Sequence, residues 1–145
     1  MNSTAPIRIL TVDDHPMLLE GISALLGSET DMALIAEASN GREAINQFRA
    51  HRPDVTLMDL QMPVMSGNEA IQAIRKEFPN ARIIVLTTYT GDVRAAQAFK
   101  AGAAGYLLKS EMRKELAETI RSVHAGQTRI PPDIQIQMEP LLSIF

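Results

Sequence analysis

Apolar residues along the chain fall into five short runs, and one segment with the spacing of an amphipathic helix separates each run from the next. The runs are residues 7–12, 32–38, 54–58, 82–87 and 105–108, with the sequences IRILTV, MALIAEA, DVTLM, RIIVLT and GYLL. They are rich in Val, Ile and Leu and have the length of strands. Near-continuous apolar runs such as 82–87 are typical of strands buried on both faces. The pattern therefore predicts an α/β fold, with a parallel sheet covered by helices on both sides.

Capping signals mark the ends of the intervening helices. A proline in the first turn, or a polar residue followed three positions later by Glu, is typical of a helix start. These signals stand at Pro16, at Asn40 with Glu43, and at Ser66 with Glu69. Gly27 ends the first helix and Pro79 stops the third. Two further helices are expected over Asp92–Ala101 and from about Glu111 to Ala125.

Composition and charge narrow the class of protein. The 145 residues are 46% hydrophobic and 21% charged, which fits one globular domain. There is no Cys and no apolar run of about 18 residues. We therefore expect no disulfides, no secretion signal, no membrane span and a cytoplasmic setting. The net charge of −3 provides no basic field for nucleic acid, so any DNA binding must come from elsewhere.

The sequence divides near residue 125. Residues 1–125 contain all five predicted strand and helix units, whereas residues 126–145 contain three prolines and no clear amphipathic helix. We interpret 126–145 as a linker or tail. It carries one basic residue, Arg129, against Asp133 and Glu139. We therefore expect that it cannot make several contacts with DNA phosphates.

Polar residues gather where the predicted strands end. The first strand is followed by Asp13 and Asp14, the third by Asp59, the fourth ends in Thr87 and Thr88, and the fifth is followed by Lys109. Ligands of open parallel α/β sheets bind beyond these carboxyl ends. Three carboxylates that face one another need a compensating charge, and Mg²⁺ with its preference for oxygen ligands is the simplest answer. Lys109 and Thr87 would then suit phosphoryl oxygens, and the central Asp59 is the best candidate for a nucleophile that forms an aspartyl phosphate.

Four segments carry a resemblance to a known family. VDDHP, LMDLQMPVMSG, VLTTY and GYLLKS resemble, in order and spacing over residues 7–125, the receiver domain of two-component response regulators. The resemblance implies a flavodoxin-like (βα)5 fold with strand order 2-1-3-4-5 and Asp59 as phosphoacceptor. It also implies that Asp14, Asp59 and the backbone carbonyl of Gln61 hold Mg²⁺, with Asp13 acting mainly through a metal-bound water. Thr87 and Lys109 would hold the phosphoryl group, and Tyr106 would be the aromatic residue that changes rotamer when Thr87 moves.

The same resemblance suggests partners and an output. The DDHP start, the pair Lys109–Ser110 and the segment RIPPDI resemble the NarL/FixJ subfamily with LuxR-type output. This implies a sensor histidine kinase as phosphodonor, a phosphorylation-linked homodimer, and control of transcription through a C-terminal helix-turn-helix domain that this chain does not contain. Such a receiver is no enzyme beyond its own phosphorylation and dephosphorylation. The alternative is a stand-alone or degenerate receiver that acts only by protein contact.

Other interpretations stay open at this point. A phosphatase of the haloacid-dehalogenase kind needs a second Asp two residues after its nucleophile, where this chain has His15 or Gln61. A dinucleotide-binding module needs a glycine-rich turn after the first strand, where this chain has DDHPM. The acidic pair could merely cap a helix, Tyr106 could be a core residue, and His15 is expected to be a surface or cap residue. Ser110 replaces the family's commoner proline, which predicts either a cis bond or a different loop path.

Overall fold

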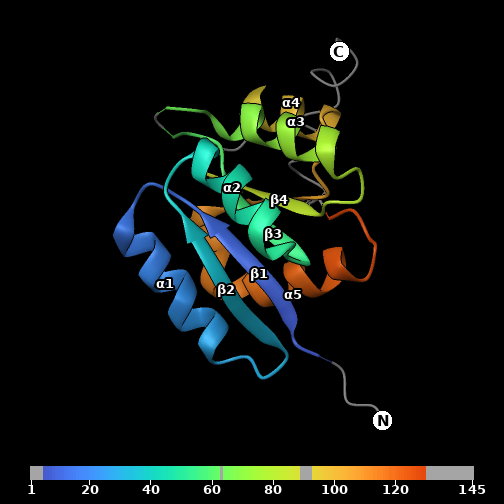
Figure 1. The fold of residues 1–145 in the computed structure, drawn as a ribbon. Coiled ribbons are helices and arrows are strands. Elements are labelled where there is room, and N and C mark those ends of the chain that lie inside the picture. Colours follow the sequence, from blue (N-terminus) through green and yellow to red (C-terminus); the bar gives the residue numbers. More distant parts are fainter. Residues whose placement is uncertain (1–4, 63, 89–92, 130–145) are drawn as a thin grey trace.

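The computed structural model describes residues 5–62, 64–88 and 93–129. Its five strands form one parallel sheet, and Figure 1 shows the arrangement of the strands and helices. The strands are β1 (Ile7–Val12), β2 (Met32–Ala38), β3 (Val55–Asp59), β4 (Ile83–Thr87) and β5 (Gly105–Leu108). Their order is β2-β1-β3-β4-β5, and every neighbouring pair is parallel. The predicted fold class and strand order are confirmed. No helix in the described ranges is long and apolar enough to span a membrane.

The first three helices begin where their caps predict. The helices are α1 (Pro16–Gly27), α2 (Gly41–His51), α3 (Gly67–Glu77), α4 (Val93–Lys100) and α5 (Met112–His124), with a 3-10 turn, η1 (Lys109–Glu111), before α5. The Asn40 side chain accepts a hydrogen bond from the Glu43 amide, and Ser66 and Glu69 form the reciprocal capping box. The predicted first residue of the fourth helix, Asp92, lies outside the described residues.

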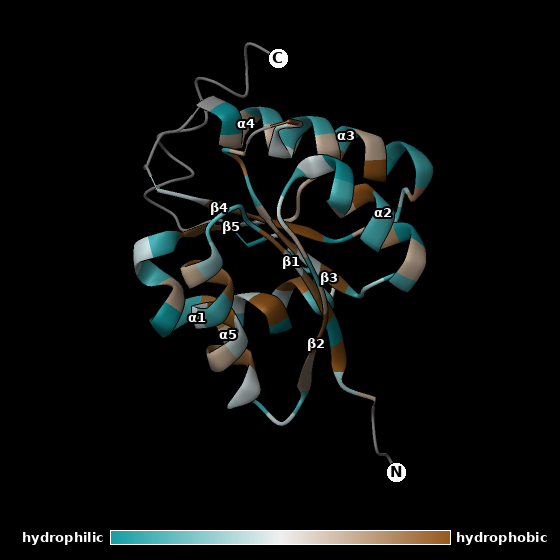
Figure 2. Cartoon of the chain, turned by 60° about the vertical axis from the view of Figure 1, so that its left-hand side comes forward, coloured by the Kyte–Doolittle hydropathy of each residue, from teal (hydrophilic) through white to brown (hydrophobic). Residues whose placement is uncertain are grey.

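Helices cover both faces of the sheet, so the hydrophobic core has two parts. One cluster lies under α2, α3 and α4 and includes Phe48 and Ile74. The other lies under α1 and α5 and includes Ile22, Leu26 and Ile120. Figure 2 shows the strands, with long stretches in brown, between these two helical layers. The strands are therefore buried on both faces, which is the reason for their near-continuous apolar sequences.

Strand β2 contains one residue more than its pairing with β1 needs. Leu34 pairs with Ile9 and Ala36 pairs with Leu10, so Ile35 has no partner residue in β1. Because of this bulge, Leu34 packs against the cluster under α1 and α5, whereas Ala36 packs against the cluster under α2, α3 and α4. The strand thus changes faces at its midpoint.

The segment after α5 returns to the sheet. Arg129 forms an isolated parallel bridge with Gly105, at the outer edge of β5. Its amide donates to the Ala104 carbonyl at 2.9 Å, and its own carbonyl accepts from the Tyr106 amide at 3.0 Å. The rest of the predicted linker, residues 130–145, lies outside the described residues.

Candidate functional site

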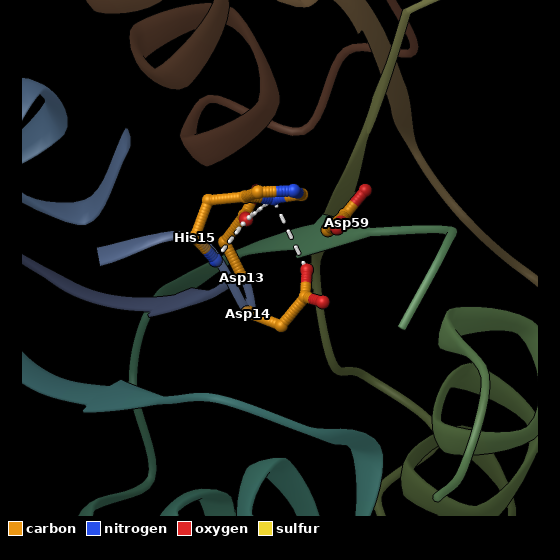
Figure 3. A group of neighbouring side chains, drawn as sticks. All are labelled: Asp13, Asp14, His15 and Asp59. Atoms are coloured by element: carbon orange, nitrogen blue, oxygen red, sulfur yellow. Dashed lines mark hydrogen bonds and ion pairs between the residues drawn. The ribbon is translucent and has the colours of Figure 1, made fainter. Parts of the chain in front are cut away.

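The predicted acidic residues meet at the carboxyl edge of the sheet. Asp13 follows β1 and Asp59 ends β3, which is the neighbouring strand. Asp13 is fully buried, Asp59 is 2% exposed, and the Asp14 side chain is partly exposed. One ligand atom from each of Asp13, Asp14, His15 and Asp59 lies within 4.8 Å of the others (Figure 3). Oxygen donors gathered in this way suit a hard divalent cation such as Mg²⁺.

Lys109 supplies a positive charge from the other side of the site. It is the first residue of η1, directly after β5. Its Nζ lies 3.1 Å from Asp59 Oδ1 and 3.2 Å from Asp13 Oδ2. The ammonium group therefore bridges the two buried carboxylates and reduces their mutual repulsion.

Asp59 occupies an environment that opposes its negative charge. Burial is the largest cause that raises the pKa of this carboxyl group, and the nearby Asp13 carboxylate raises it further. Lys109 and the Gln61 amide, which lies 3.3 Å from Asp59 Oδ1, act in the opposite direction. Within the described part of the chain, Asp59 Oδ2 is buried and has no hydrogen-bond partner. A buried carboxylate oxygen without a partner is unfavourable, which favours a cation or a bound group at this position.

Strand register places Thr87 between the strands of Asp59 and Lys109. Asp59 pairs with Leu86, so Thr87 lies one residue further along β4, and Thr87 in turn pairs with Leu108, the residue before Lys109. Thr87 is 3% exposed. It is the last residue of β4, at the carboxyl edge of the sheet, and its contact with a phosphoryl group stays a prediction.

Tyr106 lies in the core, further from the carboxyl edge of the sheet than Thr87. It is 1% exposed and belongs to the cluster under α2, α3 and α4. It pairs with Val85, two residues before Thr87 on β4. Both the core interpretation and the switch interpretation remain compatible with this position, since a buried ring next to β4 could change rotamer with Thr87.

His15 contacts the acidic pair, which the sequence analysis did not predict. It is the residue before α1, as expected, and its side chain is 64% exposed. Its Nδ1 lies 2.8 Å from Asp13 Oδ1 and 3.1 Å from Asp14 Oδ1, and its backbone amide donates to Asp13 Oδ1 at 2.8 Å (Figure 3). The only signal in the sequence was the adjacency of the three residues.

We expect His15 to titrate above 6.5 in the metal-free protein. The hydrogen bond that the protonated ring donates to the Asp13 carboxylate is the largest cause that raises the pKa of this imidazole, and the Asp14 carboxylate raises it further. Because the folded-state value is raised, the favourable interaction is fully present below the unfolded-state pKa and is lost as pH rises through the folded-state pKa. NMR titration of the His15 ring should show a lower pKa in Asp13→Asn than in the parent protein. The remote variant Asp54→Asn should leave it unchanged; an unshifted value in the parent protein would contradict the contact.

The loop after β5 takes a different path rather than a cis bond. No peptide bond in the described residues is cis, and Lys109–Glu111 form η1. The 3-10 turn delays the start of α5 to Met112, one residue later than predicted. Ser110 therefore leaves Lys109 directed at the acidic residues.

Gly67 allows α3 to approach Asp59 closely. Its amide donates to the Leu60 carbonyl at 3.3 Å. A Cβ atom at Gly67 would lie 2.3 Å from the Asp59 carbonyl oxygen and 2.8 Å from Leu60 Cα. The first turn of α3 thus fixes the backbone that carries Asp59, and only glycine fits there.

Comparison with known proteins gives consistent matches. The family model described as "Response regulator receiver domain" matches residues 9–121. The transcriptional regulatory protein LnrK of Bacillus subtilis is 35% identical over 132 residues, which cover 91% of this chain and 60% of that protein. The response regulator protein VraR of Staphylococcus aureus is 35% identical over 132 residues, with 91% and 63% covered. The chain thus spans less than two thirds of the length of these curated relatives.

Solved structures agree with these matches. A two-component response regulator of the LuxR family from Aurantimonas sp. SI85-9A1 superimposes with a TM-score of 0.87 at 38% identity, covering 94% of this chain and 97% of that one. The signal receiver domain of the putative response regulator NarL from Mycobacterium tuberculosis superimposes with a TM-score of 0.81 at 31% identity, covering 86% and 100%.

Proposed function

The chain belongs to the response regulator receiver domain family, and we propose that it works as a phosphorylation switch whose phosphoacceptor is Asp59. Its similarity to LuxR- and NarL-type regulators places it among receivers related to transcription regulators. The family match spans most of β1 to α5, whereas the boundary of a receiver at 1–125 and a linker at 126–145 is part of the proposal.

One observation carries this proposal. Asp59 is buried at the centre of the site, with the Lys109 ammonium group 3.1 Å from Oδ1 and with Oδ2 lacking a hydrogen-bond partner within the described residues. The carboxylate is thus held in place by one oxygen while the other is available for bond formation. This is the arrangement that a carboxylate nucleophile requires.

The transfer step follows from this geometry. An oxygen of Asp59 forms a bond to the phosphorus atom, while the bond from phosphorus to a histidine nitrogen of the donor kinase breaks and its electron pair returns to the imidazole. Lys109 then contacts an oxygen of the transferred group and balances part of its charge. Thr87 donates a hydroxyl hydrogen bond to another oxygen. The receiver modifies only itself, so it releases no separate product pool.

The acidic residues also fit Mg²⁺. Asp14, Asp59 and the Gln61 carbonyl would hold the ion directly, and Asp13 would act mainly through a bound water. When bound, the ion supplies positive charge to the phosphoryl oxygens. His15 is a poor ligand for Mg²⁺, and its contacts instead suit it to orient the Asp13 carboxylate.

We expect Asp14→Ala to weaken Mg²⁺ binding more than Asp13→Ala does. Asp14 is partly exposed and can reach an ion directly, whereas Asp13 is fully buried and already forms an ion pair with Lys109. Loss of an outer-sphere carboxylate costs roughly tenfold in affinity, and loss of a direct ligand should cost more. Calorimetric titration of both variants with Mg²⁺ measures the difference, and equal losses would contradict this division of roles.

Phosphorylation should act on α4 and β5 through Thr87 and Tyr106. The added group would draw the Thr87 hydroxyl inward and leave room for the Tyr106 ring, which shifts the population between two packings.

We therefore expect Thr87→Ala to accept the phosphoryl group but to lose the phosphate-dependent NMR shifts of α4 and β5. The neighbouring variant Thr88→Ala serves as the control, since Thr88 is exposed at the same strand end. It should keep both the phosphorylation and the shifts. Shifts that persist unchanged in Thr87→Ala would refute the coupling.

The proposal also covers the phosphodonor, the oligomeric state and the output of the receiver. We assign a sensor histidine kinase as donor, a phosphorylation-linked homodimer, and control of transcription through a DNA-binding domain beyond this chain. The alternative of a degenerate receiver is disfavoured because the acidic, threonine and lysine positions are all filled and meet at one edge. Incubation with acetyl phosphate and Mg²⁺ followed by intact mass spectrometry tests the function. A gain of one phosphoryl group is expected, and no gain would overturn the proposal.

A further inference from the structure

The outer edge of β5 is covered by the chain's own segment Gln127–Arg129. β5 is the last strand of the sheet, so one row of its backbone groups faces away from β4. Such a row is a template for any additional strand. Here Arg129 occupies it as a single parallel rung, with one hydrogen bond from the Tyr106 amide and one to the Ala104 carbonyl.

Side chains of α5 hold this segment in place. Arg129 Nη1 lies 3.2 Å from Ser122 Oγ and 3.6 Å from a carboxylate oxygen of Glu118. The Gln127 amide donates to the Ser122 carbonyl at 3.0 Å, and Gly126 takes a positive φ of 96°. A glycine at this point lets the chain leave the helix and reverse towards the sheet. The segment is thus aligned by the end of α5 before it reaches β5.

The bridge at Arg129 joins the tightly packed strand β5 to the short segment Gln127–Arg129. A Cβ atom at Gly105 would lie 2.9 Å from Ile84 Cγ1 and 3.0 Å from Val123 Cγ2, so β5 is tightly packed between β4 and α5. The next residue that would donate to β5 in a continued parallel ladder is Pro131, which has no amide hydrogen. Within residues 93–129 the segment therefore pairs with β5 at Arg129 alone, and Pro131 could not add a further amide donor if β5 moved.

We propose that Gln127–Arg129 docks in cis on the β5 edge in the unphosphorylated protein and that phosphorylation of Asp59 releases it. This inference rests on the proposed function. The link is Tyr106, whose ring packs in the core near Thr87's strand and whose amide holds Arg129. A rearrangement of Tyr106 that shifts the backbone of β5 misaligns both hydrogen bonds to Arg129. Gln127–Arg129 is held by fewer contacts than β5, so this segment detaches. The linker would thereby report the state of the phosphoryl site.

Amide hydrogen exchange in the full chain tests the release directly. Beryllofluoride with Mg²⁺ serves as the phosphoryl mimic. We expect the Tyr106 amide to be protected without the mimic and to exchange faster with it, while the amides of β1 and β3 stay protected. A chain that binds beryllofluoride but keeps Tyr106 equally protected would overturn the inference alone. A chain that binds no beryllofluoride would overturn the proposed function and this inference with it.

Reciprocity provides a second measurement. If release accompanies phosphorylation, then a variant that cannot dock should bind the mimic more tightly. Arg129→Pro removes the amide that donates to Ala104, and we expect its affinity for beryllofluoride to rise about fivefold or more. Arg129→Ala is the matched control: it keeps both backbone hydrogen bonds and loses the contacts with Ser122 and Glu118, so its affinity should rise less. Affinities of Arg129→Pro and the parent chain that agree within error would overturn the coupling.

Discussion

Asp59→Asn should abolish the incorporation of phosphate from acetyl phosphate and Mg²⁺. An amide has nearly the same shape as the carboxylate but lacks the anionic oxygen that must form the bond to phosphorus. The contact with Lys109 also changes from an ion pair to a hydrogen bond between the ammonium group and an uncharged amide oxygen, so the site binds the phosphoryl group less tightly. Intact mass should therefore show only the unmodified variant under conditions that modify the parent chain.

Asp54, the residue before β3, provides a matched control. Its side chain accepts a hydrogen bond from the Arg8 amide at 2.9 Å, and an asparagine there can still accept it. Asp54→Asn should incorporate phosphate as the parent does. Undiminished incorporation of phosphate in Asp59→Asn would contradict the assignment of Asp59 as phosphoacceptor. A circular dichroism spectrum of Asp59→Asn like that of the parent would show that the variant is folded and that only the modification is lost.

Gly67→Ala is expected to destabilise the domain by about 1–3 kcal/mol or more. The new Cβ would lie 2.3 Å from the Asp59 carbonyl oxygen and 2.8 Å from Leu60 Cα, and both are backbone atoms that cannot rotate away. Either α3 must move outward or the end of β3 must shift. We therefore expect phosphorylation of Asp59 to slow as well, because the nucleophile is carried by the displaced backbone.

Gly21→Ala provides the opposite control. Gly21 lies inside α1, and a Cβ atom there meets nothing within 4 Å. Alanine favours the helix over glycine by about 1 kcal/mol, so this variant should be slightly more stable than the parent. Urea denaturation of both variants measures the effects. Equal midpoints for Gly67→Ala and the parent chain would show that the loop after β3 tolerates the extra atom.

The fold and the charged core of the site follow from the sequence for simple physical reasons. Strands buried on both faces have continuous apolar runs, and polar caps fix the helix starts at Asn40 and Ser66. Once the strands are parallel, their carboxyl ends share one edge whatever the side-chain details. This is why the sequence alone predicts that Asp13, Asp59 and Lys109 lie at one edge, where the structure brings them into contact.

The remaining features depend on local geometry that residue types do not specify. His15 reaches the acidic pair because the backbone turns there to start α1, and its amide and ring both face Asp13. The rung at Arg129 is a backbone contact of one residue, which leaves no periodic pattern in the sequence. The turn η1 at Lys109 is the different loop path that Ser110 left open beside a cis bond, and nothing in its three residues favours a 3-10 turn strongly.

The unpaired residue in β2 has a consequence for how this chain can vary in length. Strands cannot normally lose a single residue, because every side chain beyond the deletion then points to the opposite face. In β2 the extra residue, Ile35, already separates Leu34 on one face from Ala36 on the other. A chain that lacked Ile35 would restore regular alternation and keep each of the other side chains on its present side. Relatives that are shorter by one residue at this strand can therefore share the same sheet and the same acidic edge without compensating changes elsewhere.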